Sequence, residues 1–205
     1  MRALIVVDMQ NDFMPGGPLG VNGARDIIDP INHAMKCVDV VVATQDWHPA
    51  NHGSFAANHS DQQPGNIIDL HGLPQILWPN HCVQNTAGAD FVEGLHTQHF
   101  AAVVRKGTDI TVDSYSGFAD NGGRNPTGLA GLLKERGVEH VYVCGVATDY
   151  CVRFTAEGAK AAGFAVTLLE DAARGVELQS GDVAKAKQSL QQAGVNISTV
   201  GDALG

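Results

Sequence analysis

Short, continuous apolar runs alternate along this chain with segments in which apolar residues recur at helical spacing. A continuous apolar run of four to eight residues is typical of a strand buried on both faces, as parallel strands are. The runs predict strands at residues 3–7, 38–43, 101–104, 141–144, 164–169 and 195–200.

The segments between these runs carry apolar residues every three or four positions, which predicts amphipathic helices. Pro30 is expected to delay or kink the first of them. Thr148 and Asp149 are good helix-capping residues, so we expect a helix to begin there, with Cys151 in its first turn. The predicted helices cover residues 27–35, 127–137, 148–163 and 180–193.

This alternation predicts an α/β fold, with a doubly wound, mostly parallel six-stranded sheet and helices on both faces. The 205 residues suit one compact domain, and no repeat or linker divides them, so we expect a single domain over residues 1–205. Residues 47–99 show little periodicity and are rich in Pro, Gly, Asn and His. Long loops are rare in compact domains unless they build a site, so we expect a site-building insertion here.

Composition narrows the class of function. The formal net charge of -9 leaves no surplus of Lys and Arg for phosphates, which argues against nucleic acid and anionic membranes as partners. No apolar stretch has the length of a membrane span, and no basic segment precedes the first apolar run, so we expect neither a membrane anchor nor a signal peptide. The four cysteines are expected to be reduced thiols in a cytoplasmic protein. A small-molecule substrate fits this composition best.

Chemically active side chains follow four different predicted strands. Asp8, Asp46, Lys106 and Cys151 each stand within a few positions of the end of an apolar run. Parallel strands bring their carboxyl ends to one edge of the sheet, where ligands bind in such folds. The pattern therefore predicts that these four residues meet in one site.

Cys151 is the candidate nucleophile of this site. The start of a helix favours a thiolate, and the backbone NH groups of Cys151 and Ala147 are suited to hold an oxyanion. Asp8 is the expected base, and Lys106 would favour the thiolate by its charge. The alternatives are a small buried cysteine and a salt bridge at the sheet edge. Asp12 is a further carboxylate, for which a turn or capping role is commoner.

Asp46 and His48 predict a metal site, because positions two apart on a strand point to the same side. His81, flanked by Pro and aromatic residues, is the best candidate for a third ligand. Two histidines and one carboxylate suit zinc, iron(II) or manganese. The alternative is that these are solvated loop histidines. The other candidates were the loop residues His52, His59 and His71.

Three aromatic residues lie in the connections around the predicted edge: Phe13, Trp78 and Tyr115. Such walls suit a flat ring substrate, although ordinary loop packing is the alternative. The first strand is not followed by GxG, so a nucleotide cofactor of the Rossmann type has no support. A thiol redox function is disfavoured because Cys144 and Cys151 do not form a CxxC motif.

Six motifs in order resemble the nicotinamidases of the isochorismatase-like family of cysteine hydrolases. The resemblance covers the first three quarters of the chain and adds little after about residue 172. It implies metal-dependent hydrolysis of nicotinamide to nicotinate and ammonia, a step of NAD salvage, and often the same reaction on pyrazinamide. The motifs are VVDMQNDF at 6–13, TQDWHP at 44–49, LWPNHCVQNT at 77–86, RKG at 105–107, DSYSGF at 113–118 and GVATDYCV at 145–152.

The resemblance implies a role for each candidate residue. Ser54 is the nearest match to a further metal contact, direct or through water. The family also has a cis peptide bond before the residue that matches Ala147, and the substrate ring is expected between Phe13 and Trp78. The implied catalytic triad is Asp8, Lys106 and Cys151, and the implied metal ligands are Asp46, His48 and His81.

Two other functions are compatible with these motifs. An amidase or isochorismatase of the same fold would act on another substrate, and a non-catalytic relative would bind a ligand without turnover. The combination of DxH with WPxHC favours the metal-dependent nicotinamide branch, with zinc or iron(II) ahead of manganese. A homo-oligomer is compatible with the resemblance.

Overall fold

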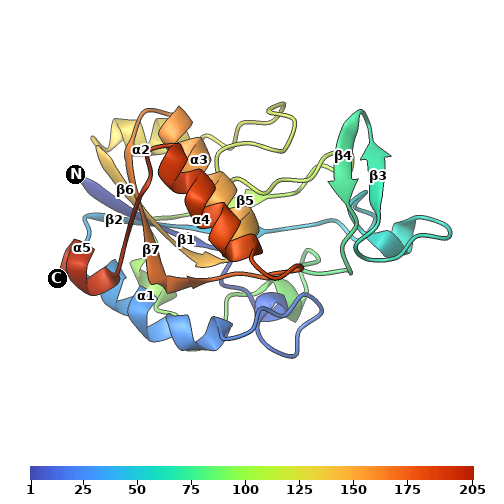
Figure 1. The fold of residues 1–205 in the computed structure, drawn as a ribbon, viewed down its shortest axis with the longest axis horizontal. Coiled ribbons are helices and arrows are strands. Elements are labelled where there is room, and N and C mark those ends of the chain that lie inside the picture. The colour runs from blue at the N-terminus through green and yellow to red at the C-terminus, as the bar shows by residue number, and fades with distance from the viewer.

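A computed structural model describes residues 1–205 and confirms the predicted six-stranded sheet (Figure 1). The strand order is β5-β2-β1-β6-β7-β8, and every pair in this sheet is parallel. The strands are β1 Arg2–Val7, β2 Val40–Asp46, β5 Ala102–Lys106, β6 His140–Val146, β7 Ala165–Arg174 and β8 Asn196–Ser198.

Strand β1 shows why the apolar runs are continuous. Leu4 and Val6 pack into the core on one face of the sheet, whereas Ala3, Ile5 and Val7 pack into the core on the other face. All five side chains are fully buried. Both faces are covered, so no position of the strand requires a polar residue.

Helices cover the two faces, as predicted (Figure 1). Helices α1 (Ile28–Met35) and α5 (Val200–Leu204) contribute to the core on one face. Helices α2 (Leu129–Glu135), α3 (Arg153–Ala161) and α4 (Asp182–Gln192) contribute to the core on the other. None of these helices combines the length and the apolar character that crossing a bilayer requires.

Helix α5 corrects the predicted end of the last strand. Strand β8 ends at Ser198, and the side chain of Thr199 accepts a hydrogen bond from the backbone N–H of Asp202 at 3.1 Å. Capping by Thr199 therefore begins a helix at Val200, which the sequence pattern assigned to the strand.

The segment that carries Cys151 differs from the predicted helix start. Residues 148–152 form one turn of π-helix that leads into α3, and no side chain caps it. The carboxylate of Asp149 instead accepts the N–H groups of Val176 and Glu177, at 3.0 and 2.7 Å. The expectation that Thr148 and Asp149 cap this helix is wrong, because the Asp149 carboxylate is hydrogen-bonded to backbone N–H groups of a loop distant in sequence.

Residues 47–99 are more ordered than their sequence indicates. They contain an antiparallel hairpin, β3 (Ile67–Leu70) and β4 (Leu73–Ile76), which lies apart from the main sheet (Figure 1). His71 and Gly72 between the two strands both have positive φ, as the tightest hairpin turns require. The two strands are too short to show a period of two in the sequence.

The order of the strands in the sheet indicates where a ligand would bind. From the central pair β1 and β6 the chain builds outward through β2 and β5 on one side and through β7 and β8 on the other. Ligands of open α/β sheets bind at the carboxyl ends of the strands next to such a reversal. The strands β5, β2, β1 and β6 are consecutive in the sheet, and their carboxyl ends carry the four residues that the sequence predicted to meet.

Candidate active site

Lys106 lies at the centre of the predicted convergence. Its Nζ is 2.8 Å from Asp8 Oδ2, 3.4 Å from Cys151 Sγ and 2.5 Å from Asp46 Oδ1. It also donates a hydrogen bond to the carbonyl of Ser114 at 3.0 Å. Side chains from four strand ends therefore meet around one ammonium, as the parallel sheet predicted.

The charges of this group support one another although all of them are buried. Burial alone would lower the pKa of Lys106, but the carboxylates of Asp46 and Asp8 raise it well above its usual value. Burial would raise the pKa of Asp46, but Lys106 and then His48 bring it below its ordinary range. Lys106 is thus held as a cation and Asp46 as an anion.

Burial dominates the environment of the Cys151 thiol. Burial raises the pKa of its thiol well above the usual value, and the attraction of Lys106 only partly offsets this effect. This direction opposes the thiolate that the start of a helix is expected to favour, because desolvation and two nearby carboxylates oppose the effect of the ammonium. Burial also raises the pKa of Asp8, which makes its carboxylate a better proton acceptor. A thiol beside a basic carboxylate is an arrangement for proton transfer during attack.

Thr44 orients the Asp8 carboxylate. The Thr44 hydroxyl donates to Asp8 Oδ1 at 2.6 Å and accepts the Asp8 backbone N–H at 3.3 Å. Asp8 Oδ2 is left to face Lys106. Sequence reasoning missed this role of Thr44, although the residue stands in the same motif as Asp46.

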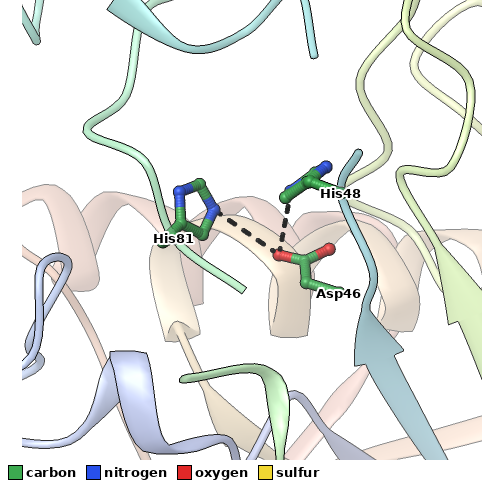
Figure 2. Close-up of side chains that lie close together, drawn as sticks. All are labelled: Asp46, His48 and His81. Atoms are coloured by element: carbon green, nitrogen blue, oxygen red, sulfur yellow. Dashed lines mark ion pairs between the residues drawn. The ribbon is translucent and has the colours of Figure 1, made fainter. Parts of the chain in front are cut away.

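Asp46, His48 and His81 form the predicted metal group (Figure 2). Asp46 Oδ2 lies 3.6 Å from His48 Nε2 and 3.8 Å from His81 Nε2, and all three residues are buried. His48 lies two residues beyond the end of β2, at the start of residues 47–99, whereas His81 comes from further along the same stretch. The insertion therefore contributes to the site.

Backbone carbonyls fix the tautomers of both histidines. His48 Nδ1 is 2.8 Å from the carbonyl of Gly107, and His81 Nδ1 is 2.8 Å from that of Pro79. A carbonyl can only accept, so each Nδ1 carries a proton, and Nε2 is the ring nitrogen that faces Asp46 and is available to a metal. A Cβ atom at Gly107 would overlap the His48 ring. Two imidazole nitrogens and a carboxylate aimed at one point fit a divalent transition metal.

The remaining histidine candidates lie elsewhere. The Ser54 hydroxyl is 2.7 Å from His52 Nδ1. His52 and Asp113 form a second buried group with His48. His71 is exposed, and His59 Nε2 bonds to the carbonyl of Gly53. The role of Ser54 in a metal shell stays a prediction.

A cavity opens beside both groups. Trp78 Nε1 donates to the Tyr115 hydroxyl at 3.1 Å, and the rings of Trp78 and Tyr150 meet edge to face at 5.1 Å. These aromatic walls suit a flat ring. Phe13, Trp78 and Tyr115 line the cavity as predicted, with Asp46, His81, Ala147 and Cys151; sequence reasoning missed Leu19, Asp113, Tyr150 and Val176.

Two further predictions concern the backbone. The Val146–Ala147 peptide bond is cis, as the resemblance implied, and Ala147 borders the cavity. Use of the Ala147 and Cys151 NH groups for an oxyanion stays a prediction. The Asp12 carboxylate accepts the backbone N–H of Cys82 at 2.7 Å, so it joins two segments distant in sequence and does not form the local turn or cap expected for it.

Comparisons with known proteins agree with this site. An isochorismatase domain model matches residues 2–202. A nicotinamidase of Acinetobacter baylyi is 47% identical over 193 residues, covering 94% of this chain and 90% of that protein. A solved nicotinamidase and pyrazinamidase of Acinetobacter baumannii has a TM-score of 0.95 at 47% identity, covering 99% of this chain and 98% of that one. A pyrazinamidase of Pyrococcus horikoshii in complex with zinc has a TM-score of 0.78 at 42% identity, covering 97% and 98%.

Proposed function

The chain belongs to the isochorismatase family, and we propose that it is a metal-dependent amidohydrolase that converts nicotinamide to nicotinate and ammonia. The observation that carries this proposal is the contact of Lys106 with both Cys151 and Asp8, beside an aromatic cavity and a group of two histidines and one carboxylate. The relatives reported above support nicotinamide as the substrate, and the reaction would serve NAD salvage.

The first half of the reaction forms a thioester. Cys151 Sγ attacks the carboxamide carbon while its proton passes to the Asp8 carboxylate. The oxyanion that forms is held by the NH groups of Ala147 and Cys151. Asp8 then gives its proton to the departing nitrogen, the C–N bond breaks and ammonia leaves.

The second half hydrolyses the thioester. A water molecule attacks the acyl carbon and gives a proton to Asp8, the C–S bond breaks, and the proton returns to the Cys151 sulfur. Nicotinate leaves. Lys106 holds Asp8 close to the sulfur throughout and balances the negative charge of the carboxylate.

Asp46, His48 and His81 would hold one divalent transition metal, with zinc or iron(II) ahead of manganese. When bound, this ion supplies a positive centre that orients a ring nitrogen and orders water. The zinc complex of the Pyrococcus horikoshii relative supports zinc. Phe13 and Trp78 are the proposed walls for the ring, with Tyr115 beside Trp78.

The rival functions keep the fold and change the chemistry. A relative without turnover has no use for a nucleophile, base and ammonium in mutual contact. A family amidase or isochorismatase for another substrate has no evident need for the metal group together with an aromatic cavity. Both rivals predict that nicotinamide is left intact.

Ammonia release by the zinc- or iron(II)-loaded enzyme tests the proposal. Nicotinamide and pyrazinamide share a ring nitrogen placed alike relative to the carboxamide, so we expect both to be hydrolysed. Benzamide has the same size but no ring nitrogen, so it is the matched control and should react far more slowly. Nicotinamide left intact by metal-loaded protein would refute the assignment, and equal rates on benzamide would refute the role given to the ring nitrogen.

A further inference from the structure

The pairing of strands β1 and β2 ends before Asp8, which follows β1, and before Asp46, the last residue of β2. Their paired register ends at Val6 and Ala43. Asp8 then turns the chain away with a φ of 49°. The backbone ladder therefore does not set the distance between Asp8 and Asp46, which belong to the two halves of the site.

The side chain of Gln10 bonds across this gap. Its Oε1 accepts the backbone N–H of Asp46 at 2.8 Å, and its Nε2 donates to the carbonyl of Asp46 at 2.8 Å. Nε2 also donates to the carbonyl of Ala89 at 2.9 Å. Gln10 is fully buried, so its amide pairs with Asp46 as a peptide group of a neighbouring strand would.

Asp46 has to serve both halves of the site at once. Its Oδ1 contacts Lys106, and its Oδ2 faces His48 and His81. A small shift or rotation of the Asp46 backbone would spoil one set of contacts while improving the other. Functional groups tolerate displacements of only about 0.5 Å before they lose efficiency.

We propose that Gln10 is a positioning residue that fixes the Asp46 backbone relative to Asp8, and so sets the spacing between the metal group and the nucleophile. The Gln10 backbone N–H also donates to the carbonyl of Asp8 at 2.7 Å. Gln10 therefore connects the segment that carries Asp8 to Asp46 by hydrogen bonds. This inference rests on the function proposed above, because it assigns the two groups to one reaction.

Gln45 provides a matched control. It is nearly as buried as Gln10, and its Nε2 donates to the same Ala89 carbonyl at 2.9 Å. Its side chain makes no hydrogen bond to the Asp46 backbone; its Oε1 accepts one from Arg105. Replacing Gln45 therefore removes a buried amide and a hydrogen bond to Ala89 but leaves the hydrogen bonds between Gln10 and the Asp46 backbone in place.

The experiment compares Gln10→Leu, Gln10→Glu and Gln45→Leu in the full chain. Zinc affinity is measured by competition with a chelator, kcat and KM by ammonia release, and folding by the melting temperature. We expect Gln10→Leu to lower zinc affinity by about 10- to 100-fold, the usual effect of losing a residue that orients a ligand. Its kcat should fall as well, whereas Gln45→Leu should bind zinc as the wild type does.

Gln10→Glu keeps an acceptor for the Asp46 N–H but places oxygen against two carbonyls. We expect Gln10→Glu to lower zinc affinity at least as much as Gln10→Leu does. If Gln10→Leu does not fold, the zinc affinity of Gln10→Glu tests the proposal instead. Wild-type zinc affinity in a folded Gln10 variant, or an equal loss in Gln45→Leu, would overturn the proposal. Zinc affinity is read without substrate, so an inactive wild-type enzyme would sink the proposed function and leave this test valid.

Discussion

The two halves of the site are held by different physical means. The nucleophile half, Asp8, Lys106 and Cys151, is held by charge: a buried ammonium touches a carboxylate and a sulfur. The metal half is held by backbone carbonyls that fix each histidine ring through its Nδ1. Asp46 belongs to both halves, because its two oxygens face in different directions.

The difference between the two halves indicates that a bound cation would balance the charge of the site. Two buried carboxylates, Asp8 and Asp46, face a single ammonium, that of Lys106. Buried charge is costly unless it is compensated. A divalent ion next to Asp46 would offset the excess negative charge and leave Lys106 to Asp8 and Cys151. In the proposed reaction, the metal half would therefore support the nucleophile half electrostatically as well as by orienting the substrate.

The largest expected effect comes from removing the nucleophile and leaving the metal half intact. Cys151→Ala should lower kcat/KM by about 10⁴-fold or more, since removal of a nucleophile eliminates the covalent route. Zinc content should not change, because Cys151 does not contact His48 or His81. Ammonia release and elemental analysis check both statements. Cys144→Ala is the control, since this buried cysteine lies outside the cavity; Cys151→Ala with nearly normal turnover would contradict the mechanism.

The next effect comes from the opposite perturbation. His81→Ala removes one ligand and leaves Cys151 in place, so zinc affinity should fall by about 100-fold, with a matching loss of activity at limiting zinc. Chelator competition and activity against zinc concentration measure these changes. His71→Asn is the control: His71 is exposed, and asparagine tolerates its positive φ. Unchanged zinc affinity in His81→Ala would remove His81 from the metal group.

The smallest effect is expected in the cavity that the two halves share. Tyr115→Phe removes a hydroxyl that accepts hydrogen bonds from Trp78 Nε1 and Gln75 Nε2, at 3.1 and 3.2 Å. The loss of about 1 kcal/mol should raise KM roughly fivefold with kcat little changed. Steady-state kinetics measure both. Tyr142→Phe, on β6 and outside the cavity, should leave KM unchanged, and a fall in kcat alone for Tyr115→Phe would argue against a binding role.

The sequence by itself determined the sheet and the convergence at its edge. Strands buried on both faces leave an unbroken apolar signal, as in residues 3–7, and parallel pairing brings the ends of such strands together. Asp8, Asp46, Lys106 and Cys151 were therefore placed in one site without knowledge of strand order. The short spacing of Asp46 and His48 predicted their shared direction in the same way.

Only the tertiary structure decided the direction in which the pKa of Cys151 shifts and the partners that orient its neighbours. The pKa of the thiol depends on how deeply the fold buries the sulfur, which no local pattern encodes. Gln10 reaches Asp46 across 36 positions, and Asp149 bonds to Val176 and Glu177 from 27 and 28 positions away. Hydrogen bonds of this kind depend on where two distant segments lie in space, so chain folding specifies them and sequence spacing does not.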